Sequence, residues 1–408
     1  MAKHIMEGFD RFLPYNDALH IFDSIKWRYP NSENTGINSS LNMISYTDVY
    51  SDYDIPEFNK SAVDGYAVIS GDIISASINN PAVLKIRGYS EAGEKFSGKI
   101  DRNECIEVYT GSEIPDGADA VVKVEDAEKH GNCIHVYSPV KRDNIFKHGE
   151  DIPAGYKIVG RNEKISPQHI AAMASAGINN IYVYKKIRIG IISTGNELAN
   201  KKIVNSTGIL LKNYYNSHFT ETMDGGIYGD NADDIITGIK NIIDVCDIII
   251  VTGGTSLGRK DKTTDAISST GEMLFSGIAI KPGRTAALFD VNSKPVISVS
   301  GLPVAALISS LIFINRYIKN LYSFDYYSKI TGILDENIHN KIGFTLFQIC
   351  RTYVKGNRVH ILPLKTTGSG ILSTIIYGNS IAMVPENLEG IENNKDVTVY
   401  MLGDIKWD

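Results

Sequence analysis

The chain contains little cysteine, and its cysteines do not form a recognisable pattern. Four cysteines occur in 408 residues, at Cys105, Cys133, Cys246 and Cys350, and no two of them form a Cys-x-x-Cys pair. This spacing argues against a disulfide framework and against the common structural zinc sites. Sparse cysteine is also typical of a reducing compartment, so we expect a cytoplasmic protein.

The chain also lacks an excess of positive charge and a recognisable targeting segment. Its formal net charge of −6 gives no overall field that would attract nucleic acid. Residues 1–10 lack the hydrophobic core of a signal peptide, and we expect no apolar run long enough to span a bilayer. We therefore expect neither a nucleic acid nor a membrane as a partner.

Composition and length together indicate a globular protein of several domains. Apolar residues make up 43% and charged residues 22% of the chain, which is close to the averages of folded proteins. Because a single core stops growing well below 408 residues, two to four domains are expected.

The first half of the chain changes texture twice. Residues 11–29 have helical spacing of apolar residues, and residues 30–42 are rich in Asn, Ser and Gly and are predicted to form a loop. Short strands separated by turns then predict a β-rich inserted domain over 48–148. The helical pattern returns afterwards, so we predict one domain made of 1–47 together with 149–184.

The second half alternates strands and helices before it returns to strands. Residues 187–194 and 247–252 are apolar without strict alternation, as in buried parallel strands, and residues 232–244 place isoleucines on one helical face. This alternation predicts a doubly wound α/β domain over 185–325. Residues 326–408 are predicted to form a small β domain.

Three segments combine glycine with polar residues where no core periodicity requires them. They are FNKSAVDGYA at 58–67, IISTGNEL at 191–198 and VTGGTSLG at 251–258. The last two directly follow apolar strands, and open α/β sheets bind anionic ligands at the carboxyl ends of their strands. We therefore expect a composite site for a phosphorylated small molecule.

The segment at 251–258 provides the most direct candidate for a phosphate site. Gly253, Gly254 and Gly258 would let backbone amides approach a phosphate, and Thr255 and Ser256 would donate further hydrogen bonds. The motif alone is equally compatible with an ordinary strand-to-helix turn.

Carboxylates and cations close to these segments allow two interpretations each. Asp261 either caps the next helix or binds Mg²⁺ beside a phosphate, with Glu197 as a second ligand. Lys281 and Arg284 lie on a Pro-Gly turn, where they are either solvated or hold an anionic substrate.

Six segments, in this order, resemble the signature motifs of one family, the molybdopterin molybdenumtransferases, which include MoeA and the E domain of gephyrin. FNKSAVDGYA resembles that family's DNSAMDGYA, and ISTGNEL resembles its STGDEL. The other matching segments are YTGSEIPDGADAVV at 109–122, HGEDIPAG at 148–155, TGGTSLGRKD at 252–261 and IKPGR at 280–284. Together the segments extend over nearly the whole chain.

The resemblance implies a fold and a reaction. The fold would be an α/β multidomain chain: a doubly wound MogA-like α/β domain, an elongated helical/β N-terminal part, the β-rich insertion and a small C-terminal β-barrel domain. The reaction would be insertion of molybdate (or tungstate) into adenylylated molybdopterin, assisted by Mg²⁺, with release of AMP. The resemblance also implies a homodimer whose site is shared between protomers, and it suggests the molybdopterin adenylyltransferase as a partner.

The resemblance also implies roles for particular residues. Four carboxylates would be catalytic: Asp64, Asp151, Glu197 and Asp261. Asp64 and Asp151, in the first two domains, would act in trans on the partner's site. Glu197 and Asp261 would also bind the metal. Pterin or nucleotide contacts would come from Thr252, Gly253, Gly254, Thr255, Ser256, Gly258 and Ser369. Molybdate contacts would come from Lys281, Arg284 and Lys262.

The sequence departs from the family pattern at 301–309, GLPVAALIS. Val304, Ala305 and Ala306 stand where the family has Gly, Asn and Pro, and Asn196 replaces an aspartate. An apolar substitute can still begin a helix, so we expect the fold to survive. An alternative function therefore stays open, in which the chain is a catalytically impaired paralogue that acts as a molybdopterin-binding carrier or scaffold.

Overall fold

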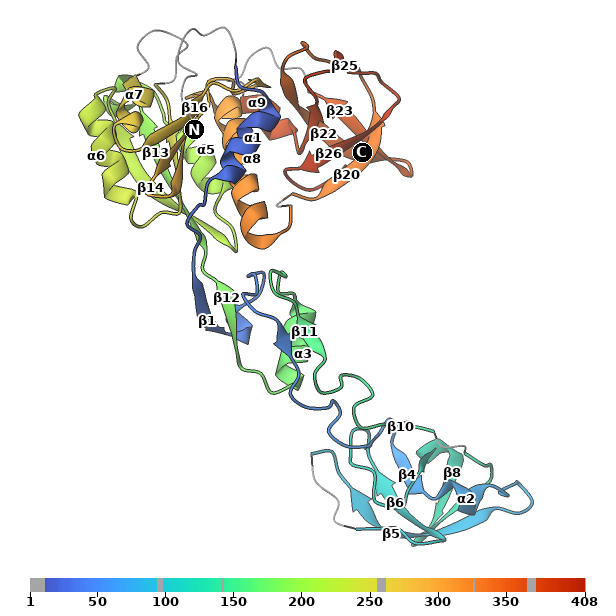
Figure 1. The fold of residues 1–408 in the computed structure, drawn as a ribbon. Coiled ribbons are helices and arrows are strands. Elements are labelled where there is room, and N and C mark those ends of the chain that lie inside the picture. Colours follow the sequence, from blue (N-terminus) through green and yellow to red (C-terminus); the bar gives the residue numbers. More distant parts are fainter. Residues whose placement is uncertain are drawn as a thin grey trace. The chain divides into compact units, whose positions relative to one another are not determined.

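The computed structural model describes residues 12–93, 98–140, 143–254, 262–325, 327–364 and 372–407 (Figure 1). The chain forms two compact units. One comprises the described parts of Met1–Glu33 and Tyr184–Asp408, and the other comprises those of Asn34–Val183. The chain therefore leaves the first unit, builds the second and returns.

A six-stranded sheet lies at the centre of the α/β part of the first unit. Its strand order is β14 (Thr220–Tyr228), β13 (Ile187–Thr194), β15 (Ile248–Thr252), β19 (Lys294–Val299), β18 (Ala287–Val291) and β16 (Glu272–Ser276). The first four strands are parallel, whereas β18 runs antiparallel to both of its neighbours. The sheet is therefore mixed at one edge. Asn292 and Ser293 both have positive φ, at 57° and 61°, which is the turn geometry that closes a two-residue hairpin between β18 and β19.

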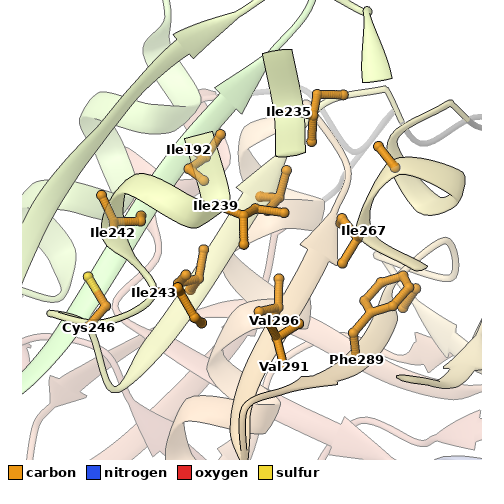
Figure 2. Close-up of a cluster of buried hydrophobic side chains, with 14 residues drawn as sticks. Ile192, Ile235, Ile239, Ile242, Ile243, Cys246, Ile267, Phe289, Val291 and Val296 are labelled. Atoms are coloured by element: carbon orange, nitrogen blue, oxygen red, sulfur yellow. The ribbon is translucent and has the colours of Figure 1, made fainter. Parts of the chain in front are cut away.

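Helices cover both faces of this sheet, which confirms the doubly wound α/β expectation. Helices α6 (Ala232–Ile242) and α7 (Lys262–Ser268) lie on one face, where α6 directs its isoleucines onto the strands (Figure 2). Each of these buried isoleucine side chains contributes about 1.5–3 kcal/mol of transfer free energy. The other face carries α5 (Ser206–Tyr214), α8 (Pro303–Tyr322) and α1 (Tyr15–Ser24), all in mutual contact through α8.

Helix α8 corrects the expectation about apolar runs. Its 20 residues have a mean hydropathy of 1.2 over an 18-residue window, which is long and apolar enough to cross a membrane. Within the structure, however, 72% of that window is buried against other elements, as in the core helix of a folded domain.

An ion pair joins α1 to α8 and makes stability depend on acid. Arg316 donates through Nε to Asp23 Oδ1 at 2.7 Å and through Nη2 to Oδ2, and Asn320 Nδ2 donates to Oδ1 at 2.9 Å. These hydrogen bonds, chiefly those from Arg316, hold the pKa of Asp23 below its usual value. Because the folded pKa is depressed, the stabilisation is present above the unfolded pKa and is lost as the pH falls through the folded pKa.

We predict that Asp23→Asn lowers the free energy of unfolding by about 0.5–1 kcal/mol at pH 7, the range of well-aligned surface pairs. The difference from wild type should shrink as the pH falls below the unfolded value of 3.8. Urea unfolding measured across that range checks this. Asp17→Asn, an exposed aspartate of the same helix, should change stability less, and a pH-independent difference for Asp23→Asn would contradict the ion-pair explanation.

The C-terminal part of the first unit contains a closed five-stranded barrel, as expected. Around the barrel the strands are β22 (Thr345–Lys355), β23 (Arg358–Pro363), β20 (Lys329–Leu334), β26 (Asp396–Met401) and β24 (Ser380–Val384), which pairs again with β22. Two short strands also pair with β22: β17 (Ile280–Lys281) and β27 (Lys406–Trp407). Helix α9 (Leu372–Tyr377) and the pair β21 (Ile338–His339) and β25 (Gly390–Ile391) complete this part.

The second unit contains a six-stranded β-sheet and a smaller helical and β part. The sheet order is β7 (Ala120–Lys123), β4 (Gly65–Val68), β6 (Glu104–Val108), β5 (Ala82–Ser90), β9 (Cys133–Val136) and β8 (Ala127–His130), with α2 (Ser70–Ile73) and η2 (Val124–Asp126) beside it. The smaller part contains β1 (Ser32–Gly36), β12 (Asn180–Tyr184), η1 (Ile37–Ser39), β2 (Val49–Tyr50), β11 (Lys157–Val159), α3 (Pro167–Ser175), and the pair β3 (Lys60–Ser61) and β10 (Ile145–Phe146).

Two predictions near the N-terminus were wrong in extent. The helix predicted over 11–29 occupies only Tyr15–Ser24, because Pro14 lies at its N-cap and the backbone turns extended at Ile25. The loop predicted over 30–42 contains strand β1 and the short helix η1. Strand β1 exists because it pairs with β12, a contact that its polar sequence does not indicate. The four domain boundaries predicted from the sequence stay predictions.

Candidate functional site

Three neighbouring parallel strands end at the same edge of the α/β sheet. Ser193 of β13 pairs with Thr252 of β15, and Thr252 pairs with Val299 of β19. The strand ends are joined further by Thr194 Oγ1, which donates to the Thr252 carbonyl at 3.1 Å. The chain therefore leaves the sheet after Thr194 and after Thr252 side by side, at the edge where α/β sheets bind anions.

The backbone after β15 takes a path that requires glycine. Gly253 and Gly254 have φ of 97° and 68°, and Gly253 N donates to Val299 O at 3.1 Å. A Cβ atom at Gly253 would lie 2.2 Å from Thr194 O, and one at Gly254 would lie 2.0 Å from Thr263 Oγ1. Gly254 is exposed while Thr252 is buried, so the chain emerges to solvent at this turn.

Glu197 projects from the neighbouring turn. It lies on the short helix α4 (Asn196–Ala199), which begins directly after Gly195, and it is exposed. Its carboxylate folds back over the preceding turn, since a Cβ at Gly195 would lie 2.7 Å from Glu197 Oε1. Among the residues that the structure describes, this carboxylate has no hydrogen bond or ion pair, so its oxygens are available to a ligand.

A reciprocal pair of hydrogen bonds fixes the start of α4. Asn196 N donates to Asp230 Oδ2 at 3.3 Å, and Asp230 N donates to Asn196 Oδ1 at 3.2 Å. Asp230 was not predicted as a site residue. Its position two residues after β14, the fourth parallel strand, is the sequence signal that could have found it. An aspartate at position 196 could accept the same hydrogen bond from Asp230 N, but its carboxylate would then lie close to the carboxylate of Asp230. The asparagine avoids this repulsion.

The start of α8 joins the glycine turn to the Lys-Pro-Gly-Arg turn. A Cβ at Gly301 would lie 3.5 Å from Gly253 Cα, and a Cβ at Gly283 would lie 3.1 Å from Ala305 O. The same added Cβ would lie 3.1 Å from Ser309 Cβ on the next turn of α8. The two turns, far apart in sequence, thus pack against one short stretch of chain.

The two cations of the second turn lie over aromatic rings. Lys281 is half-buried, with Nζ 5.1 Å from the centroid of the Phe344 ring. Arg284 is exposed, with Cζ 5.9 Å from the centroid of the Phe12 ring. These contacts hold both side chains while leaving their charges available to an anion.

The departure from the family pattern at 301–309 changes the beginning of α8 without disrupting it. Pro303 occupies the first turn of the helix, and Val304, Ala305 and Ala306 are almost fully buried. Thr207 Oγ1 donates to Gly301 O at 2.6 Å and holds the preceding turn. The expectation that an apolar substitute can begin this helix is confirmed.

Some of the predicted residues cannot be placed. Thr255, Ser256, Gly258, Asp261 and Ser369 lie outside the described residues. Lys262 is exposed at the start of α7. Among the described residues, no group of three or more His, Cys, Asp or Glu side chains could hold a metal ion. The two-carboxylate Mg²⁺ site stays a prediction because one of its ligands is Asp261.

Asp64 and Asp151 lie in the second unit, and both are exposed. Asp64 Oδ1 accepts hydrogen bonds from Thr110 N at 2.7 Å and Thr110 Oγ1 at 2.8 Å. These bonds lower the pKa of Asp64, so it is ionised at neutral pH. Asp151 N donates to Ile55 O at 3.1 Å. The catalytic roles assigned to both by resemblance stay predictions.

Three family models match the chain along most of its length. They are the MoeA N-terminal region (domain I and II) over residues 13–177, a probable molybdopterin binding domain over 190–320, and the MoeA C-terminal region (domain IV) over 331–402. The six sequence motifs thus led to the correct family.

Individual proteins match over nearly the full chain as well. A protein of Methanocaldococcus jannaschii named for molybdopterin biosynthesis is 32% identical, covering 90% of this chain and 91% of its own length. The molybdopterin molybdenumtransferase of Staphylococcus aureus is 28% identical, covering 90% of each chain. Two crystal structures of the molybdopterin biosynthesis MoeA protein of Pyrococcus horikoshii are 28% identical, with TM-scores of 0.84 and 0.81, and cover 97% and 96% of this chain and all of theirs.

The curated relatives named molybdenumtransferase also agree with the expectation of a transferase. With three consecutive family models and a relative that is 32% identical over nine tenths of the sequence, this chain belongs to the MoeA family of molybdopterin biosynthesis proteins.

Proposed function

We propose that this protein inserts molybdenum into molybdopterin during molybdenum cofactor biosynthesis, using adenylylated molybdopterin and molybdate (or tungstate) as substrates and releasing AMP. The observation that carries the proposal is the meeting of three elements at one sheet edge. The glycine turn, Glu197 and the Lys-Pro-Gly-Arg turn all border the strand ends or the start of α8. The sequence placed these elements on separate segments.

The chain's own residues suit a substrate that is anionic at two places. Gly254 is exposed and carries no side chain, so a phosphate could approach the backbone at this turn, where Thr255, Ser256 and Gly258 follow in sequence. Lys281 and Arg284, with Lys262 as a further candidate, would hold the molybdate dianion close to the anionic pterin by reducing their repulsion.

Glu197 and Asp261 would hold Mg²⁺, which prefers oxygen ligands. The free carboxylate of Glu197 fits this role, because the described structure gives it no competing partner. When bound, Mg²⁺ would neutralise charge on the phosphoanhydride. Glu197 would then hold the ion close to the strand edge, and the backbone of the glycine turn would hold the phosphate chain.

The remaining parts of the proposal concern the assembly. We propose a cytoplasmic homodimer in which Asp64 and Asp151 of one protomer complete the site of the other, and in which Ser369 faces the same cleft. The molybdopterin adenylyltransferase is the proposed partner, since it would supply the adenylylated substrate. The family relationship supports these points, and mixed dimers of Asp64→Ala and Glu197→Ala chains would test the shared site by restoring turnover.

The experiment that tests the reaction supplies purified protein with adenylylated molybdopterin, Mg²⁺ and molybdate. We expect release of AMP together with a pterin product that activates an apo-molybdoenzyme. A protein that binds the pterin tightly but releases no AMP would reject the transferase.

Such an outcome would favour the second candidate, a molybdopterin-binding carrier or scaffold. One observation favours this alternative: the first turn of α8, which follows the segment bordering the glycine turn, contains the buried apolar residues Val304, Ala305 and Ala306 and offers no polar side chain to a ligand. Pterin binding measured in parallel separates the two functions.

A further inference from the structure

A basic surface lies on the C-terminal barrel, on elements that the proposed reaction does not use. It is formed where β22 runs between β23 and β27, and we call it the basic face: Arg351, Lys355, Arg358 and Lys406. Lys355 pairs directly with Arg358, and Tyr353, two residues before Lys355, pairs with His360 on one side and with Lys406 on the other. Directly paired residues, and residues two apart on a strand, share one side of a sheet.

This side of the sheet points away from the barrel core. Cys350 and Thr352, which alternate with the outward residues of β22, are fully buried. Lys355, Arg358 and Lys406 are exposed, and the described residues provide no ion pair to any of the three. Their charges are therefore open to solvent.

The carboxylate that lies within this surface is already satisfied. Asp335 Oδ1 is 2.7 Å from His360 Nδ1, and Asp335 Oδ2 accepts a hydrogen bond from Tyr353 OH at 2.9 Å. The rings of Tyr353 and His360 lie 5.6 Å apart, and the Arg351 guanidinium lies 5.7 Å from the Tyr353 ring centroid. These hydrogen bonds and ring contacts hold the side chains at the centre of the basic face in fixed positions. Asp396 lies further along the barrel, opposite Ile333 of β20, and marks the edge of the basic face.

The basic face contrasts in sign with the rest of the protein. The whole chain has a formal net charge of −6, so the residues other than these four cations sum to −10. Three of these cations, Lys355, Arg358 and Lys406, are exposed and have no ion pair within the described residues. Such a concentration of positive charge on an acidic protein attracts a local anionic partner and leaves the remaining surface repulsive to it. Trp407, on the adjacent edge strand, is 81% exposed, and an exposed tryptophan is a common anchor in protein interfaces.

We infer that the basic face binds a carboxylate-rich segment of a partner protein. A short acidic segment matches a surface three strands wide, whose strands lie about 4.8 Å apart. A long nucleic acid would extend onto the acidic surface around it. The aromatic rings of the cluster are moreover packed against one another and against a guanidinium, which leaves them poorly placed to stack on bases.

The test titrates the full-length protein with a fluorescently labelled, glutamate-rich synthetic peptide and follows its anisotropy. We expect binding that weakens as salt is added, and no binding of the same peptide with glutamine in place of glutamate. The combined change Lys355→Glu, Arg358→Glu and Lys406→Glu should weaken the peptide at least about tenfold, or ~1.4 kcal/mol. The milder change of the same residues to glutamine should weaken it less, and circular dichroism will verify that both variants fold.

A matched variant controls for net charge. Lys26→Glu, Lys164→Glu and Lys240→Glu alter three exposed lysines elsewhere to the same total charge, and this variant should bind the peptide like wild type. Equal losses in both charge-reversed variants, or none in the first, would overturn the inference. Tighter binding of single-stranded oligothymidine than of the peptide, dependent on the same residues, would also overturn it in favour of nucleic acid.

Discussion

Gly253→Ala should be among the most damaging single changes in this protein. Alanine at a φ of 97° costs about 1–2 kcal/mol. The added Cβ would also lie 2.2 Å from Thr194 O, a backbone atom that β13 holds in place, and such overpacking adds about 1–3 kcal/mol. We therefore expect a loss of about 2–5 kcal/mol in urea unfolding of the first unit, together with loss of AMP release because the turn must move away from the strand edge.

Gly356→Ala separates backbone strain from steric conflict. Gly356 also has a positive φ, of 60°, but a Cβ there would have no atom within 4 Å. Its alanine variant should lose only about 1–2 kcal/mol and keep full activity. Equal losses at both positions would show that the contact with Thr194 is not what makes Gly253 necessary.

Glu197→Ala should lower the rate of AMP release about 10²–10³-fold, the effect typical of removing one group that stabilises developing charge. Its stability should stay within about 0.5 kcal/mol of wild type, because the side chain is exposed and its carboxylate has no partner in the described structure. Single-turnover assays with adenylylated molybdopterin, together with urea unfolding, measure both quantities. The combination of intact stability and lost turnover is what a ligand-binding carboxylate predicts.

Glu272→Ala provides the comparison for this variant. Glu272 is also exposed, at the beginning of β16 in the same sheet, and it borders none of the three elements of the proposed site. Its alanine variant should turn over normally. Normal turnover of Glu197→Ala would remove Glu197 from the metal site, and raising the Mg²⁺ concentration should partly rescue the variant if the assignment is right.

Local patterns in the sequence were sufficient for much of the fold. The apolar run at 187–194 and the isoleucine stripe of α6 predicted β13 and one helix of the doubly wound domain, because burial on one or two faces imposes a period on the sequence. The limits of α3 also agree with local sequence signals, because the helix begins at Pro167 and ends shortly before Gly177, and proline favours the first turn of a helix and glycine the position after its end. Strand β1 was missed because its polar residues carry no such period.

The sequence by itself determined the family, the main strands and helices, and the glycine turn that follows β15. These follow from motifs, periodicity and backbone freedom, which are properties of short segments. Only the tertiary structure decided that the turn at Gly283 meets the turn at Gly253 through the start of α8, that Asp230 clasps Asn196, and that four cations gather on one side of the barrel. Each of these three features depends on packing or strand register between segments that are distant in sequence. Such contacts leave no periodic pattern in the residues of either segment.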